Sequence, residues 1–135
     1  MYEPRTYRNW HKDADLVSFS VVVRETDLLI RAPRDLTDPA LKAVRKYRTL
    51  LEYYIESHPI FAVSLEPVIV TKDAPQLVRD MADAAREAGV GPMAAVAGAI
   101  AEAVGRDLLE FCDEIIVENG GDIFIKTAKE RNIGI

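Results

Sequence analysis

The stretch that most constrains the fold is residues 91–105, GPMAAVAGAIAEAVG, which holds six alanines, three glycines and a single charge, at Glu102. Glycine inside a helix costs about 0.5–1 kcal/mol relative to alanine, so Gly98 in mid-helix needs a structural reason. At helical spacing the small residues share one side of the helix, while Met93 and the large aliphatic residues lie on another. We therefore predict a helix with two contact faces, one of which lets a neighbour approach to backbone distance.

Two interpretations of that close approach stay open. Another helix or the sheet can pack on the small-residue face, which is a common use of such faces. Alternatively, a ligand can approach it, because Gly89 and Gly91 place uncovered amides at a helix N-terminus. The helix dipole at such an end favours an anion such as a phosphate.

Two segments with a period of two residues flank the helical part of the chain. Phe19, Val21 and Val23 alternate with polar residues, and residues 28–30 resume the apolar pattern after the polar residues 24–27. Residues 115–117 and 123–125 form a second pair of apolar runs, separated by a glycine-containing turn. Each pair predicts a β-hairpin.

Three helices are predicted between the hairpins. The first has Asp38 as its N-cap and ends before Pro59, and the second begins at Asp73 and ends at Gly89. The third is the alanine-rich helix, which we expect to continue to about Phe111. The order of hairpin, helices and hairpin predicts one α+β domain over residues 1–135, an antiparallel sheet with its helices on one face.

The composition excludes several classes of partner. A net charge of -5 and a pI near 5.1 oppose a broad nucleic-acid surface. Residues 7–12, YRNWHK, mix aromatic and basic side chains, but such a short segment is more typical of an edge strand or terminus. No uncharged run reaches the roughly 20 residues of a membrane span. Cys112 is the only cysteine, which favours a reducing compartment. We expect a soluble, cytoplasmic protein that binds neither nucleic acid nor membrane.

The last turn, ENGGD at residues 118–122, also has two interpretations. The pair Asn119-Gly120 suits a tight hairpin turn, because both residues tolerate positive φ. A tight turn does not explain the second glycine, Gly121, or the two flanking carboxylates. Carboxylates beside exposed amides can bind ribose hydroxyls or a hard metal ion. The sequence does not say which of Glu118 and Asp122 would face such a site.

The segments AGVGPMAAVAGAIAEAVG (88–105) and EIIVENGGDIFI (114–125) together resemble an uncharacterised family grouped with the ApbE-like flavin transferases. YEPRTYR, VRETDLLIRA and YIESHPIF fit the same family, so the resemblance covers nearly the whole chain. It implies a T-fold-like β2-α2-β2 unit, half of an ApbE-like fold. The characterised transferases use FAD and magnesium to place FMN on a threonine or serine of a target protein.

The resemblance also implies a site. In the transferases, a helix with a Lys-Gly pair and a downstream aspartate lies beside a strand ending in Gly-Gly-Asp, and both contact the flavin nucleotide. The counterparts are Ala97-Gly98 with Glu102, and Gly120-Gly121-Asp122. Ala97 replaces the lysine, and the half of the family that carries the magnesium ligands has no counterpart here. Transferase activity is therefore not expected of this chain alone, which we expect to be a fragment or to be completed by a second chain.

The predicted function is a flavin- or nucleotide-binding domain, with FAD or FMN and magnesium as the implied cofactors and a nucleotide-type small molecule as ligand. The predicted site residues are Gly91, Met93, Gly98, Glu102, Asn119, Gly120, Gly121 and Asp122. The alternative is a non-enzymatic oligomerisation or interaction module, in which the alanine-rich helix packs on a second copy; a homo-oligomer is expected. Hydrolysis through His11 or His58 is disfavoured, because neither has a recognisable nucleophile beside it.

Overall fold

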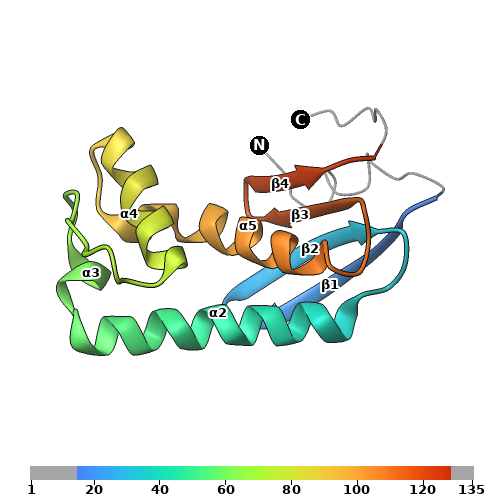
Figure 1. The fold of residues 1–135 in the computed structure, drawn as a ribbon, viewed down its shortest axis with the longest axis horizontal. Helices are drawn as coiled ribbons and strands as arrows, with labels where there is room; N and C mark the ends of the chain where they lie inside the picture. Colours follow the sequence, from blue (N-terminus) through green and yellow to red (C-terminus); the bar gives the residue numbers. More distant parts are fainter. Residues whose placement is uncertain (1–14, 129–135) are drawn as a thin grey trace.

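A computed structural model describes residues 15–128 and shows a four-stranded antiparallel sheet in the order β1-β2-β3-β4 (Figure 1). The predicted α+β class with an antiparallel sheet is confirmed. The strands are β1 (Val17–Val23), β2 (Thr26–Ala32), β3 (Ile115–Asn119) and β4 (Asp122–Lys126). The helices are α2 (Thr37–Ser57), α3 (Ile60–Val63), α4 (Gln76–Ala88), the 3-10 helix η1 (Pro92–Ala95) and α5 (Val96–Leu108).

The first hairpin follows the predicted alternation. Phe19 pairs with Ile30 and Val21 pairs with Leu28, and all four side chains are buried on the same face of the sheet. The connection is tighter than the polar run suggested, because Thr26 already belongs to β2. The turn is closed by a non-glycine residue with a positive φ of 53°, Arg24.

The second hairpin differs from its prediction by one residue. Asn119 pairs with Asp122 across the strands, so the two turn residues are Gly120 and Gly121 rather than Asn119 and Gly120. Gly120 has a φ of 63°, the left-handed conformation that glycine adopts at little cost. The Asn119 side chain donates a hydrogen bond to α5, which holds this residue in the strand and leaves the turn to the glycines.

Helix starts also differ from the predictions. The helix α2 begins at Thr37, one residue before the predicted cap Asp38, because the Thr37 N–H donates to Asp35 Oδ1 at 2.8 Å. The helix α4 begins at Gln76 rather than Asp73, whose carboxylate instead accepts a hydrogen bond from a threonine hydroxyl two residues earlier. Its end at Gly89, with a φ of 71°, is as predicted.

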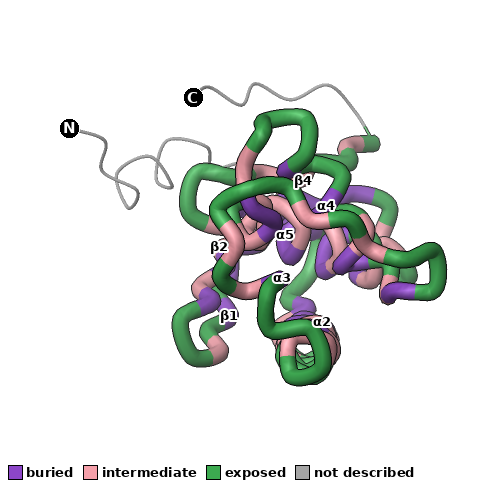
Figure 2. Tube along the Cα trace, turned by 90° about the vertical axis from the view of Figure 1, so that its left-hand side faces the viewer, coloured by how far each residue is buried: buried purple, intermediate pink, exposed green. Residues whose placement is uncertain are grey.

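The core lies between one face of the sheet and two helices. Along that face α2 contacts β1, whereas α5 contacts β3 and β4, and the two helices also contact each other. The helix α4 packs on η1 and α5 at one end of the molecule (Figure 1). Figure 2 shows the buried segments gathered around α5. The largest fully buried side chains are Phe61, Leu28, Ile30, Leu36, Met81, Leu108 and Ile115.

The alanine-rich segment is not one continuous helix. It begins as η1 and becomes α-helical only at Val96, and α5 ends at Leu108 rather than near Phe111. In residues 15–128 no single helix has the length and apolar character to cross a membrane. Gln76–Ala88 and Pro92–Leu108 meet that test only as a pair, bent by 105°.

Candidate functional site

The small residues of the alanine-rich segment are close to other parts of the same chain. A Cβ atom on Gly105 would lie 2.2 Å from Cδ2 of Phe124 in β4. A Cβ on Gly91 would lie 1.8 Å from the backbone oxygen of Ser64. The space beside these two glycines, on the side where a Cβ would stand, is therefore filled by the protein, and ligand binding at Gly91 stays a prediction. The packing interpretation holds at both positions.

The predicted meeting of helix and turn is present in the structure. Asn119 Nδ2 donates to the backbone oxygen of Ala97 in α5 at 3.1 Å. The carboxylate of Asp122 lies beside Gly98, where a Cβ would be 3.2 Å from Oδ1. The neighbour that approaches Gly98 most closely is thus Asp122 itself.

The strand register answers which carboxylate faces the helix. Asp122 lies on the same face of the sheet as α5, whereas Glu118 pairs with Leu29 and Ile123 on the opposite face and is buried there. The turn residues Gly120 and Gly121 are exposed, and a Cβ atom added to either would have no neighbour within 4 Å. Neither glycine lines either of the two hollows beside α5 that are described below, and their role in binding stays a prediction.

An acidic hollow of about 280 Å³ lies beside Gly98. Its lining residues are Asp80, Ala84, Ala95, Gly98, Ala99, Glu102 and Asp122. Three of them are carboxylates and none is a cation, so this hollow repels a phosphate. Glu102 is already paired with Arg106 at 2.7 Å. Within residues 15–128, no group of three or more His, Cys, Asp or Glu side chains is arranged to hold a metal ion.

A second hollow of about 330 Å³ lies on the other side of α5, and we call it the α2–α5 pocket. Its walls come from α2, from η1 and α5, from the β1–β2 turn and from the end of β3. It is lined by Glu25, Thr26, Arg48, Leu51, Glu52, Ile55, Met93, Val96, Ala97, Ile100 and Asn119. Two of the predicted site residues, Met93 and Asn119, are among them. An apolar wall with a few polar groups is typical of a small-molecule site.

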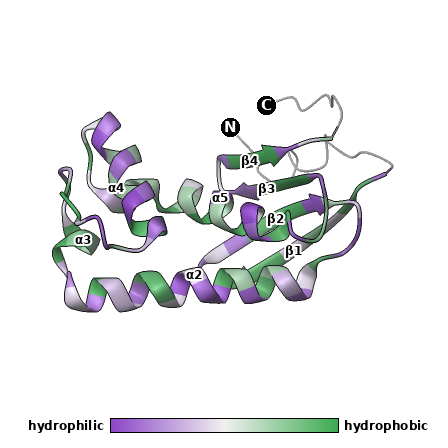
Figure 3. Cartoon of the chain, viewed as in Figure 1, coloured by the Kyte–Doolittle hydropathy of each residue, from purple (hydrophilic) through white to green (hydrophobic). Residues whose placement is uncertain are grey.

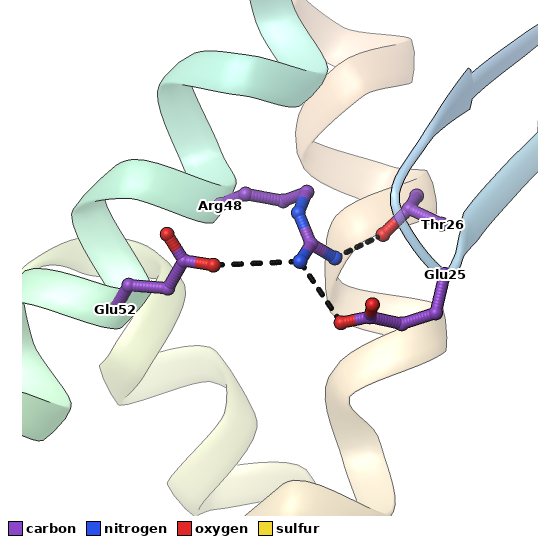
Figure 4. A network of polar contacts seen from close by, with 4 residues as sticks. All are labelled: Glu25, Thr26, Arg48 and Glu52. Carbon is purple, nitrogen blue, oxygen red and sulfur yellow. Dashed lines mark hydrogen bonds and ion pairs between the residues drawn. The ribbon is translucent and has the colours of Figure 1, made fainter.

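Arg48 dominates the polar side of the pocket (Figure 4). Its Nη1 donates to Thr26 Oγ1 at 2.6 Å, and its Nη2 donates to Glu25 Oε1 at 2.9 Å and to Glu52 Oε2 at 3.4 Å. The Arg48 side chain is only 14% exposed, whereas those of Glu25 and Glu52 are 81% and 61% exposed. The hydrogen bond from Arg48 is the largest cause of a lowered pKa at Glu25.

This arrangement was not among the features predicted from the sequence, although the sequence contains part of its signal. Arg48 and Glu52 are four residues apart on a predicted helix, where opposite charges are neighbours. Nothing in the sequence places Glu25 and Thr26, from the first hairpin, against the middle of that helix.

The other reactive side chains have structural roles. Cys112 Sγ lies within hydrogen-bond reach of the backbone oxygens of Leu108 and Glu114, and burial raises the pKa of its thiol. His58 stacks on the ring of Tyr54 with 4.0 Å between centroids and 4° between planes. Residues 7–12 and His11 lie outside the described residues.

Comparison with known proteins gives the family. The sequence matches the family described as AbpE bacteria over residues 8–135. A UPF0280 protein of Methanopyrus kandleri is 39% identical over 121 residues, which are 89% of this chain and 49% of that protein. A UPF0280 protein of Methanocaldococcus jannaschii is 42% identical over 116 residues, 85% of this chain and 47% of that protein. The chain thus spans about half the length of the curated relatives it matches.

These matches correct the resemblance drawn from the sequence. Neither the family description nor the relatives' names link the chain to the ApbE-like flavin transferases, so that assignment is wrong. FAD, FMN and magnesium were expected only from that resemblance, and they stay untested predictions. None of the names states a ligand, a substrate or a reaction, and the expectation of an uncharacterised family is confirmed. The chain belongs to the family described as AbpE bacteria.

Proposed function

We propose that this chain is a small-molecule-binding domain and that its ligand, of nucleotide type, places a flat ring in the α2–α5 pocket. The observation that carries the proposal is the pocket itself, a hollow of about 330 Å³ with apolar side chains from two helices facing it. This volume is at the lower end of the range for small-ligand sites, which suits one ring system rather than a large cofactor.

The pocket walls offer both apolar surface for the faces of a ring and a polar group for its edge. Leu51 and Ile55 of α2 and Val96 and Ile100 of α5 supply apolar surface for the two faces of a ring. Asn119 supplies a polar group at the end of β3. Because its Nδ2 is used by the α5 backbone, its Oδ1 is left to accept a hydrogen bond from an N–H group on the edge of a base.

A thermal-shift panel tests the proposal. The purified protein is melted with each common nucleoside and its monophosphate, and any hit is titrated by calorimetry. A ligand at 100 times its Kd stabilises the folded state by about 2.7 kcal/mol, which is readily measured. We expect at least one compound of the panel to raise the melting temperature.

The control is a matched pair of substitutions. Ala97→Phe fills the pocket, whereas Ala94→Phe adds the same side chain at an exposed position outside it. The shift should be lost in the first variant and kept in the second. A panel without any hit, or a hit that Ala97→Phe leaves unchanged, contradicts the proposal.

A second candidate, the interaction module, is favoured by a separate observation. Four aliphatic side chains in and after α3 are exposed, and Leu65 and Ile69 are 87% and 91% exposed. Figure 3 shows α3 in hydrophobic colours at one end of the molecule. Sedimentation velocity tests this candidate: a dimer that Leu65→Ser with Ile69→Ser converts to a monomer supports it, and a wild-type monomer opposes it.

The finer fold assignment also stays a proposal. The order of two strands, helices and two strands supports a T-fold-like unit. An experimental structure that superposes on a T-fold protein over the whole sheet and both long helices would support it.

A further inference from the structure

Arg48 and its two carboxylate partners, Glu25 and Glu52, line the same pocket. The Arg48 side chain is largely buried, yet both glutamates that it contacts are mostly exposed to solvent. It is also the one cation among the described residues that line the α2–α5 pocket. A ligand in the pocket therefore meets a largely buried guanidinium.

Of the two ion pairs of Arg48, the one with Glu52 is the weaker. The contact with Glu52 is long, at 3.4 Å, and the Glu52 side chain is mostly exposed, so water can solvate its carboxylate once the contact is broken. The shorter bond to Thr26, at 2.6 Å, fixes the guanidinium from the other side without adding a charge. Losing the Glu52 contact would thus cost little and would leave Arg48 in place.

The geometry points to an anionic group on the ligand, a carboxylate or a phosphate, which binds Arg48 in place of Glu52. This inference rests on the proposed function, because it assigns the polar end of a ligand whose ring lies against α2 and α5. A planar guanidinium matches the oxygen spacing of a carboxylate or phosphate and binds either with two parallel hydrogen bonds. Glu52 swings toward solvent when the ligand enters.

Two dyes that differ in charge test this assignment without knowledge of the natural ligand. 1-Anilinonaphthalene-8-sulfonate carries an anionic group on an apolar ring system, and N-phenyl-1-naphthylamine is its neutral counterpart. Both are titrated by fluorescence into the wild type, Arg48→Gln and Glu52→Gln. Arg86→Gln is the control, because Arg86 forms an exposed ion pair on α4, away from the pocket.

The expected result separates the two dyes. Arg48→Gln should weaken binding of the sulfonate dye roughly tenfold or more, the usual effect of losing a hydrogen bond between charged groups. It should leave the neutral dye within about twofold of the wild type. Glu52→Gln should tighten the sulfonate dye, because a competing and repelling charge is removed, and Arg86→Gln should change neither.

Different failures identify different errors. If Ala97→Phe still binds both dyes as the wild type does, the pocket is not the binding site and the proposed function fails. If both dyes depend on the pocket but Arg48→Gln weakens them equally, only the anionic group is overturned. Tighter binding of the sulfonate dye to Arg48→Gln would also overturn it. If Arg48→Gln does not fold, Arg48→Lys replaces it, because lysine keeps the positive charge but lacks the planar guanidinium. An unchanged affinity of Arg48→Lys for the sulfonate dye would count against a contact through two parallel hydrogen bonds.

Discussion

Gly105 and Gly98 lie two turns apart on α5, and alanine at these two positions should have opposite effects on stability. A Cβ on Gly105 would be 2.2 Å from the ring of Phe124, whereas non-bonded carbons normally approach to about 3.5–4.0 Å. The Cγ, Cδ2 and Cε2 atoms of Phe124 would all lie within 3.2 Å of that Cβ, so the ring must shift before an alanine fits. A Cβ on Gly98 meets only the end of the Asp122 side chain, at 3.2 Å.

The magnitudes follow from two opposing terms. Alanine stabilises a helix interior by about 0.8–1.0 kcal/mol relative to glycine. Overpacking a well-filled core costs about 1–3 kcal/mol. We therefore expect Gly105→Ala to lower the free energy of unfolding by about 1 kcal/mol, and Gly98→Ala to raise it by about 0.5 kcal/mol.

Urea denaturation followed by circular dichroism measures both variants. A double-mutant cycle with Phe124→Leu adds a second test, because the shorter side chain should recover most of the loss in Gly105→Ala and little in Gly98→Ala. Equal stability of the two alanine variants, or the absence of coupling between Gly105 and Phe124, would refute the packing explanation of the alanine-rich helix.

Other predictions concern hydrogen bonds and burial within the protein. Asp107 accepts hydrogen bonds from Lys46 at 2.5 Å and from Tyr47 at 2.7 Å, so Asp107→Asn should lower the unfolding free energy by about 1 kcal/mol, measured in urea. The hydrogen bond from Lys46 to Asp107 raises the pKa of Lys46, and burial raises the pKa of Tyr47. The contribution of each group to the free energy of unfolding is complete below its pKa in the unfolded chain and is lost as the pH rises past about 10. Melting curves over this pH range should show the loss. Asp107→Asn should weaken that alkaline loss. Burial and a raised pKa should make Cys112 react slowly with a thiol reagent in the native protein and rapidly in urea, as absorbance can follow. Asn119→Ala should lower the melting temperature by removing a contact of about 1 kcal/mol.

The hairpins and the fold class could be predicted because they depend on local periodicity. Phe19 and Val21 alternate with polar residues, and that alternation alone places them on one face of a strand. The turn between β3 and β4 was displaced by one residue, because a contact with α5 keeps Asn119 in the strand. Such a tertiary contact overrides the turn preference of an Asn-Gly pair.

The site could be predicted only in part. The composition of the alanine-rich segment correctly indicated a close neighbour, but not that Phe124 and the backbone of Ser64 fill that role at Gly105 and Gly91. The α2–α5 pocket joins elements that are far apart in the sequence, so no local pattern reveals it. Arg48 gains its importance from burial, which the sequence does not encode at a single position.

The proposal that ligands bind in the α2–α5 pocket is tested most directly by an NMR titration of ¹⁵N-labelled protein with 1-anilinonaphthalene-8-sulfonate, because the titration locates the bound molecule. If the α2–α5 pocket is the binding site, the shifted signals should cluster at Ala97, Ile100 and Asn119 and at the side-chain Nε of Arg48. If signals move only at the exposed aliphatic residues Ile60, Val63, Leu65 and Ile69, the dye binds there and binding in the α2–α5 pocket is contradicted.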